Sequence, residues 1–258
     1  MPNFVLKLPV MSNRDLPIIS DDDLSFSTLT IEPDAWDHWE LDASPMQLVG
    51  KTNNRSLTVQ GAVTNNVGTV SMFLGGNSGG KNALVSGFAD SHLQTQMAII
   101  KFSTYDPSST IPVLFGALTP SGAGSAGSAA FLAVQTLRRV FTPRGTAVDE
   151  QPKSEIVDKW VMVVLAESSN DTSRSSSLFV SGTSTPYYRE ISDNANGKIL
   201  APVNISAGNV AYSDAGTGVV SVEYAEYGIW DKMLSEAEIN SLYVRAKARM
   251  AARGLQLS

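Results

Sequence analysis

The sequence predicts an all-β protein, a two-sheet antiparallel jelly-roll sandwich with one C-terminal α-helix. Short apolar runs recur about every ten residues between turn signals, which is typical of sandwiches and not of βαβ units. A helical pattern occurs only near the C-terminus. The expected strands cover residues 26–31, 46–49, 56–59, 67–74, 82–88, 97–103, 113–117, 131–137, 159–166, 177–180, 203–207 and 219–230.

Residues 1–24 are expected to form an extended arm outside the sandwich, which takes residues 25–258. Prolines interrupt the arm, while Phe4, Leu6 and Leu8 alternate with other residues, as in an edge strand added to a neighbouring sheet. The alternative is a terminus without order. We expect the arm to dock on a neighbouring subunit or another protein.

Three stretches of small or polar residues are expected to be connections. Residues 121–130 consist of Ser, Gly and Ala and read as a flexible loop that packs no core. Residues 168–177 read as a polar hairpin connection. Residues 75–80 are glycine-rich but lack the Lys-Thr/Ser of a P-loop, so they read as a hairpin turn.

The C-terminal helix is expected to span residues 235–253. Ser235 and Glu238 have the spacing of a capping box, in which each side chain accepts a hydrogen bond from the other residue's backbone N–H. Leu234 and Ile239 occupy the two positions of a hydrophobic staple around this cap. A glycine follows residue 253 and can close the helix.

The string AEYGIWDKMLSEAEINSLY, residues 225–243, resembles the closing segment of the concanavalin A-like sandwich in its laminin G-like form. In that family a short helix with a Leu-Ser-x-x-Glu-Ile pattern packs at the sandwich edge. Residues 159–182 resemble the family's central hairpin. The resemblance covers residues 155–250 well and the first half poorly. It implies the fold, and similar domains occur in bacteriophage tail fibres and capsid-associated proteins.

Composition excludes several functions. The net charge of −6, without a basic stripe, argues against nucleic acid as a ligand. The absence of cysteine excludes disulfides and thiolate metal sites. No apolar run is long enough for membrane insertion, and the N-terminus does not read as a signal peptide. The missing signal predicts a protein made in a host cytoplasm without export, and the resemblance to phage domains implies a location in a virion.

The sequence predicts no catalytic residues. β-Glucanases of this fold need two carboxylates about 5 Å apart, carried by strings such as Glu-x-Asp-x-x-Glu, and none occurs here. Glu223 and Glu226 are three residues apart, so strand alternation places them on opposite faces, one toward solvent and one at a sheet margin. His38 and His92 are expected to be packed or hydrogen-bonded side chains. We therefore expect no enzyme activity.

Sugar recognition would need exposed aromatic faces beside amides or carboxylates. A tyrosine pair in a polar, loop-rich stretch is the first candidate, and a tryptophan pair is the second. The alternatives are that the tryptophans seal the sandwich edge and that the tyrosines lie on a partly buried strand or an interface. The expected sugar-binding residues are Tyr187, Tyr188, Asp193, Asn196, Trp36 and Trp39.

No cofactor is expected, although calcium stays an option because the resemblance includes calcium-binding relatives. Residues 193–196 or 214–217 offer oxygen ligands, and the alternative is that their Asp and Asn residues form turns.

Taken together, these expectations describe a non-enzymatic structural or adhesion component of a phage virion, such as a tail fibre, receptor-binding or decoration protein. Its expected partners are other virion proteins through the arm, further copies of itself, and host surface glycan. A free-standing lectin-like module is the alternative. A glycoside hydrolase or lyase with an unrecognised site is third.

Overall fold

The computed structural model describes residues 31–41, 48–75, 81–103, 112–121, 124–132, 136–141, 148–152, 155–182, 185–212 and 219–258. The expected arm at residues 1–24, almost all of the expected strand at 26–31, and residues 214–217 lie outside these ranges.

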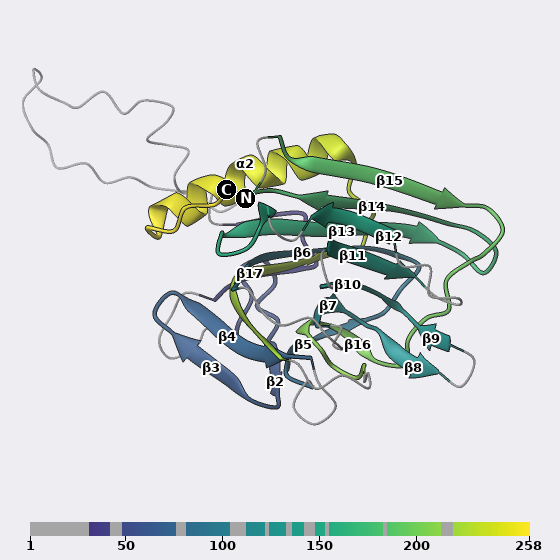
Figure 1. The fold of residues 1–258 in the computed structure, drawn as a ribbon, viewed down its shortest axis with the longest axis horizontal. Coiled ribbons are helices and arrows are strands. Elements are labelled where there is room, and N and C mark those ends of the chain that lie inside the picture. Colours follow the sequence, from purple (N-terminus) through teal and green to yellow (C-terminus); the bar gives the residue numbers. More distant parts are fainter. Residues whose placement is uncertain are drawn as a thin grey trace, which may run out of the picture.

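Two antiparallel sheets face each other, which confirms the predicted sandwich (Figure 1). A further two-stranded sheet pairs β8 (Thr119–Ser121) with β9 (Gly124–Ala126). The eight-stranded sheet has the order β15 (Tyr187–Asp193), β14 (Arg174–Val180), β13 (Val161–Ser169), β6 (Leu93–Phe102), β17 (Val220–Trp230), β4 (Thr69–Leu74) and β3 (Val63–Asn66), with β1 (Asp37–Glu40) also paired to β17. The seven-stranded sheet has the order β12 (Val148–Pro152), β11 (Thr136–Phe141), β10 (Ser128–Leu132), β7 (Val113–Gly116), β16 (Asn204–Gly208), β5 (Ala83–Ala89) and β2 (Thr58–Gln60).

The eight-stranded sheet is buried on both faces at its centre. On β13 the odd-numbered residues from Val161 to Leu165 face the core between the sheets. The even-numbered residues from Met162 to Ala166 face a second core beneath helix α2 (Glu236–Ala252). This double burial explains why β13 reads as an uninterrupted apolar run and does not alternate. No helix among the described residues is long and apolar enough to cross a membrane.

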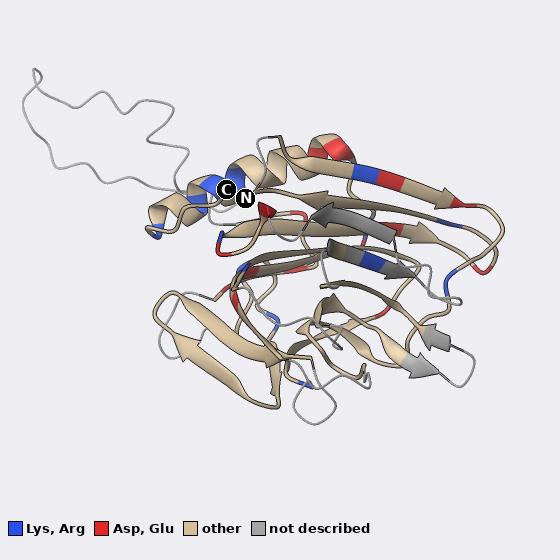
Figure 2. Cartoon of the chain, viewed as in Figure 1, with Lys and Arg blue, Asp and Glu red and all other residues tan. Residues whose placement is uncertain are grey.

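Helix α2 begins and ends where the sequence predicts. The capping box between Ser235 and Glu238 is formed, and the staple residues Leu234 and Ile239 are both buried in the core beneath the helix. Gly254 adopts a φ of 72°, and its N–H bonds the Ala251 carbonyl. Figure 2 shows acidic residues at the start of α2 and basic residues toward its end, which suits the helix dipole.

Replacing Ser235 with alanine should lower the free energy of unfolding by about 1 kcal/mol, because N–H groups of the first turn lose their acceptor. Ser241→Ala is the matched control: Ser241 lies on an exposed face of the same helix, and its hydroxyl only donates to the Ala237 carbonyl. Alanine is the better helix former there, so the control should be neutral or slightly stabilising in urea unfolding. Equal losses in both variants would contradict the cap's role.

One expected strand is divided in two, and one expected connection contains strands. The expected strand at 131–137 is two strands, because β10 ends at Leu132 and β11 begins at Thr136, and Leu132 pairs with Leu137. The expected flexible loop at 121–130 contains β9 and most of β10. Its small side chains allow close strand approach: a Cβ atom on Gly116 of β7 would lie 2.3 Å from the Ser128 carbonyl oxygen.

The other two connections have different outcomes. β13 and β14 form the predicted hairpin around residues 168–177, with Ser169 paired to Arg174. The expected glycine-rich turn at residues 75–80 lies outside the described residues except for Gly75, and the strands on either side of it, β4 and β5, belong to different sheets.

A β-bulge in β17 determines which side chains face the helix. Tyr224 pairs with Ile100 and Glu226 with Ile99, so Ala225 is an extra residue in the strand. Tyr224 and Tyr227 both face the inter-sheet core as a result. Glu223 and Glu226 therefore share the outer face of the sheet. The predicted placement on opposite faces is wrong, because strict alternation fails at the bulge.

Candidate functional site

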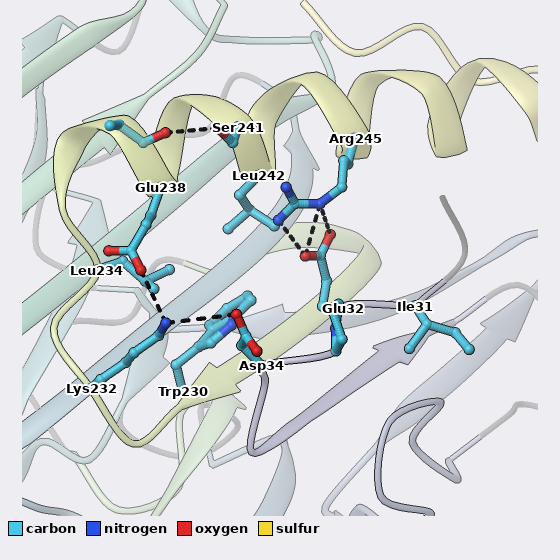
Figure 3. A pocket seen from close by; sticks show the side chains of 12 residues that line it. Ile31, Glu32, Asp34, Trp230, Lys232, Leu234, Glu238, Ser241, Leu242 and Arg245 are labelled. Atoms are coloured by element: carbon cyan, nitrogen blue, oxygen red, sulfur yellow. Dashed lines mark hydrogen bonds and ion pairs between the residues drawn. The ribbon is translucent and has the colours of Figure 1, made fainter. Parts of the chain in front are cut away.

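A pocket of about 480 Å³ lies between α2, the end of β17 and the segment that leads into β1 (Figure 3). We call it the helix pocket. Its apolar floor and walls include Leu234 and Leu242, which also belong to the core beneath the helix. Its polar side chains come from three separate parts of the chain. They are Glu32, Asp34, Lys232, Glu238, Ser241 and Arg245.

One wall of the helix pocket carries a lysine between two carboxylates. Lys232 Nζ lies 3.0 Å from Glu238 Oε1 and 3.9 Å from Asp34 Oδ2 (Figure 3). The Ser235 backbone N–H and the Lys232 ammonium lower the pKa of Glu238 to about 2. The hydrogen bond to Glu238 in turn raises the pKa of Lys232. Both groups are charged at neutral pH, and they offer fixed acceptors and donors to a polar ligand.

The opposite wall is built by an arginine paired with a buried glutamate. Arg245 Nη2 lies 2.6 Å from Glu32 Oε2 (Figure 3). The Arg245 side chain is 35% exposed, whereas that of Glu32 is only 2% exposed. Glu32 therefore holds the guanidinium of Arg245 in place at the pocket wall.

Behind this wall, charged side chains join α2 to the outer face of β17. Arg249 Nη1 lies 2.5 Å from Glu32 Oε1, and its Nη2 lies 2.8 Å from Glu226 Oε2. His38 Nε2 lies 3.0 Å from the same Glu226 oxygen. Burial alone would raise the pKa of Glu226, but the hydrogen bond from His38 and the charge of Arg249 lower it to about 2. We call Glu32, His38, Glu226, Arg245 and Arg249 the helix ion network.

A second charged cluster lies at one end of the sandwich. Lys198 Nζ is 2.6 Å from Asp90 Oδ1 and 3.0 Å from Glu167 Oε2, and Gln94 Nε2 donates to both carboxylates. Burial raises the pKa of Asp90 although Lys198 opposes this shift. Burial would lower the pKa of Lys198, but the two carboxylates raise it. Sequence reasoning missed this cluster, because no pattern joins a turn, a strand and a loop so far apart in the chain.

The buried carboxylates of both clusters can be compared with the catalytic carboxylates of glycosidases. Asp90 and Glu167 share two donors, so they lie close together, as glycosidase carboxylates must. Their side chains are, however, 0% and 2% exposed, and Lys198 pairs with both. Glu226 is likewise buried, and its low pKa makes it a poor proton donor at neutral pH.

The structure separates the predicted tyrosine site. Tyr187 and Tyr188 are neighbours on the edge strand β15 and face opposite sides, the first toward the inter-sheet core and the second toward the core beneath the helix. Asp193 lies at the far end of β15, roughly 20 Å from Tyr187 at the usual strand rise. The alternative interpretation of a partly buried strand is therefore the one that the structure shows.

Asp193 and Asn196 form a turn. The Asp193 carboxylate accepts hydrogen bonds from the Ala195 and Asn196 backbone N–H groups and pairs with Arg174 at 3.2 Å. These hydrogen bonds lower the pKa of Asp193. Among the described residues, no group of three or more His, Cys, Asp or Glu side chains is placed to hold a metal ion.

The tryptophan pair closes the sandwich edge. Trp39 is fully buried, stacks on Tyr227 with ring centroids 5.8 Å apart, and donates from Nε1 to the Arg55 carbonyl. Trp39 therefore presents no face to a sugar. Trp36 is half-buried, and the Arg55 guanidinium lies 4.0 Å from its ring centre. Both predicted histidine interpretations agree with the structure: His38 is buried, and His92 Nδ1 lies 3.0 Å from Ser169 Oγ.

Solved structures of other proteins share this fold. The binding domain of botulinum neurotoxin serotype D matches with a TM-score of 0.54 and 15% identity, over 85% of this chain and 52% of that chain. A structure of botulinum neurotoxin type C, whose description concerns interaction with two ganglioside molecules, matches with a TM-score of 0.56 and 12% identity. The match covers 85% of this chain and 52% of that chain. Trypanosoma rangeli sialidase in complex with sialic acid matches with a TM-score of 0.54 and 14% identity, over 84% of this chain and 34% of that chain.

At these identities the likeness concerns the fold alone. The chain spans about half the length of the neurotoxin chains and about a third of the sialidase chain. No family model matches the sequence, and no curated protein matches it. The class defined here is therefore the two-sheet antiparallel β-sandwich, which serves both binding domains and an enzyme among these structures.

Proposed function

We propose that this protein is a non-enzymatic adhesion module that binds carbohydrate in the helix pocket. The lining of the pocket carries this proposal. Asp34 and Glu238 offer carboxylate oxygens to sugar hydroxyls, while Lys232 and Arg245 offer donors, around an apolar floor. A pyranose has hydroxyls around its edge and C–H groups on its faces, so it matches both kinds of surface.

Structures that share the fold support carbohydrate as the ligand class. Their descriptions include interaction with gangliosides for one neurotoxin and sialic acid bound to one sialidase. This support is an analogy of fold, and the ligand site is argued from the pocket itself.

The module is further proposed to be a component of a phage virion, assembled through residues 1–24 and present in several copies. The resemblance of residues 225–243 to domains of phage tail fibres and capsid-associated proteins supports this role, as do the apolar residues of the arm. A free-standing lectin-like module is the second candidate. Binding of the arm to virion proteins would distinguish the two.

Binding in the pocket can be tested with a glycan array followed by calorimetry on the sugar that binds best. Asp34→Ala should raise the Kd at least about tenfold, because it removes a charged acceptor. Asp231→Ala is the matched control, since it removes the same charge from an exposed neighbouring position that does not line the pocket. It should leave the Kd unchanged.

The proposal fails if the wild-type protein binds no glycan, or if Asp34→Ala binds as tightly as the control. Release of reducing sugar by the purified protein would favour the hydrolase instead, and its loss in Asp90→Asn or Glu167→Gln would identify the carboxylates responsible.

A further inference from the structure

We infer a second carbohydrate subsite on the outer face of the eight-stranded sheet, centred on Phe73 of β4. The inference takes its ligand class from the proposed function but uses a different surface. We call this surface the Phe73 platform, and it consists of Phe73, Thr64, Ser71, Ser221 and Glu223.

Phe73 points away from the core because of its place in β4. Its neighbours Met72 and Leu74 pack between the sheets, so alternation turns Phe73 outward. Its side chain is 58% exposed, which makes it one of the most exposed large apolar residues described. A single exposed apolar residue needs no explanation, so the argument depends on what surrounds it.

Strand register places polar side chains beside the ring. Ser221 of β17 lies directly opposite Phe73. In the next outward-facing row, Ser71 pairs with Thr64 of β3 on one side and with Glu223 of β17 on the other. Neighbouring strands are about 4.8 Å apart, so this row extends roughly 10 Å alongside the phenyl ring. The bulge lies beyond Glu223, so alternation holds for all of these residues.

This arrangement suits a pyranose. The phenyl face can stack on the C–H groups of one sugar face. The hydroxyls of Thr64 and Ser71 and the carboxyl group of Glu223 then lie where the sugar's hydroxyls project.

A protein partner fits this surface less well. A stable protein interface buries about 800 Å² per partner around an apolar centre. The platform offers one aromatic ring, with the exposed Val219 just before the start of β17 as a further apolar residue, and polar side chains around them.

The platform and the helix pocket are independent sites. The platform uses the start of β17 at Ser221, and the pocket uses its end at Trp230. Nine residues of strand separate these positions by about 30 Å. One monosaccharide therefore cannot bridge them.

The test is ligand-observed saturation-transfer NMR with the methyl glycosides of glucose, galactose, mannose and N-acetylglucosamine, titrated into the full chain. Phe73→Ala should raise the Kd of the glycoside held by the platform about fivefold, and Phe73→Tyr should restore it. Val67→Ala, at an exposed residue between β3 and β4, is the matched control and should bind as the wild type.

The outcomes separate this inference from the proposed function. A loss with Phe73→Ala but not with Asp34→Ala supports the platform. A loss with Asp34→Ala alone overturns the platform and leaves the pocket in place, and no binding by the wild type overturns both. If Phe73→Ala leaves every Kd unchanged but converts an oligomer to a smaller species by mass, the surface is a protein interface and the inference is wrong.

Discussion

Replacing Arg249 with methionine is expected to lower the free energy of unfolding by about 3–5 kcal/mol at neutral pH, because Glu32 and Glu226 remain buried without their main cation. The pKa of Glu226 in the folded protein is about 2, below its ordinary value of 4.5. Its stabilising contribution is therefore present above pH 4.5 and lost as the pH falls toward 2. The difference in free energy of unfolding between the wild type and Arg249→Met, measured by urea unfolding, should therefore shrink over the same pH interval.

Arg245→Met is the matched control for this variant. Arg245 lies on the same helix and pairs with the same Glu32, but its side chain is 35% exposed where that of Arg249 is 1% exposed. Solvent weakens the exposed pair, so the control should lose no more than about 1 kcal/mol. If the two variants lose equal stability, burial of the helix ion network is not what makes Arg249 important.

Replacing Lys198 with methionine should be comparably destabilising, by about 3–5 kcal/mol at neutral pH, because Asp90 and Glu167 lose the ammonium between them. Burial already raises the pKa of Asp90, and removal of Lys198 should raise it further. A raised carboxyl pKa favours folding at low pH and disfavours it as the pH rises through that pKa. The difference from the wild type in urea unfolding should therefore narrow as the pH approaches 4.

Lys232→Met provides the comparison. Lys232 is also paired with two carboxylates, but its side chain and those of its partners are exposed to solvent. The expected loss is below about 1 kcal/mol. If the free energy of unfolding lost in Lys198→Met does not depend on pH, the buried carboxylates are not the cause of the loss.

The candidate site was only partly predictable. The capping box at Ser235 predicted the start of the helix that carries Glu238 and Ser241, but nothing in the sequence predicted that this segment lines a pocket. The structure does not bring the predicted tyrosine site together, because Tyr187 and Tyr188 lie on a strand and not in a loop, and a strand turns adjacent side chains to opposite faces. The structure does not expose Trp39 to a sugar either, because its ring is buried in the core.

The prediction of a flexible loop at residues 121–130 is wrong for a different reason. Residues 121–130 have the composition of a flexible linker, yet Ala129 and Ala130 are fully buried in β10. Composition reports what a segment would do alone. It cannot report that two strands approach so closely that only small side chains fit.

The sequence by itself determined the features that depend on neighbouring residues. The helix starts after Ser235 and ends before Gly254 because capping hydrogen bonds form within a few residues. The hairpin of β13 and β14 also depends on residues close together in the sequence, since its turn joins Ser169 to Arg174. Only the tertiary structure decided the bulge at Ala225, which turned Glu226 toward Arg249, and the meeting of Asp90, Glu167 and Lys198. These arrangements depend on contacts between distant segments, whose geometry appears only when the two sheets and the helix pack together.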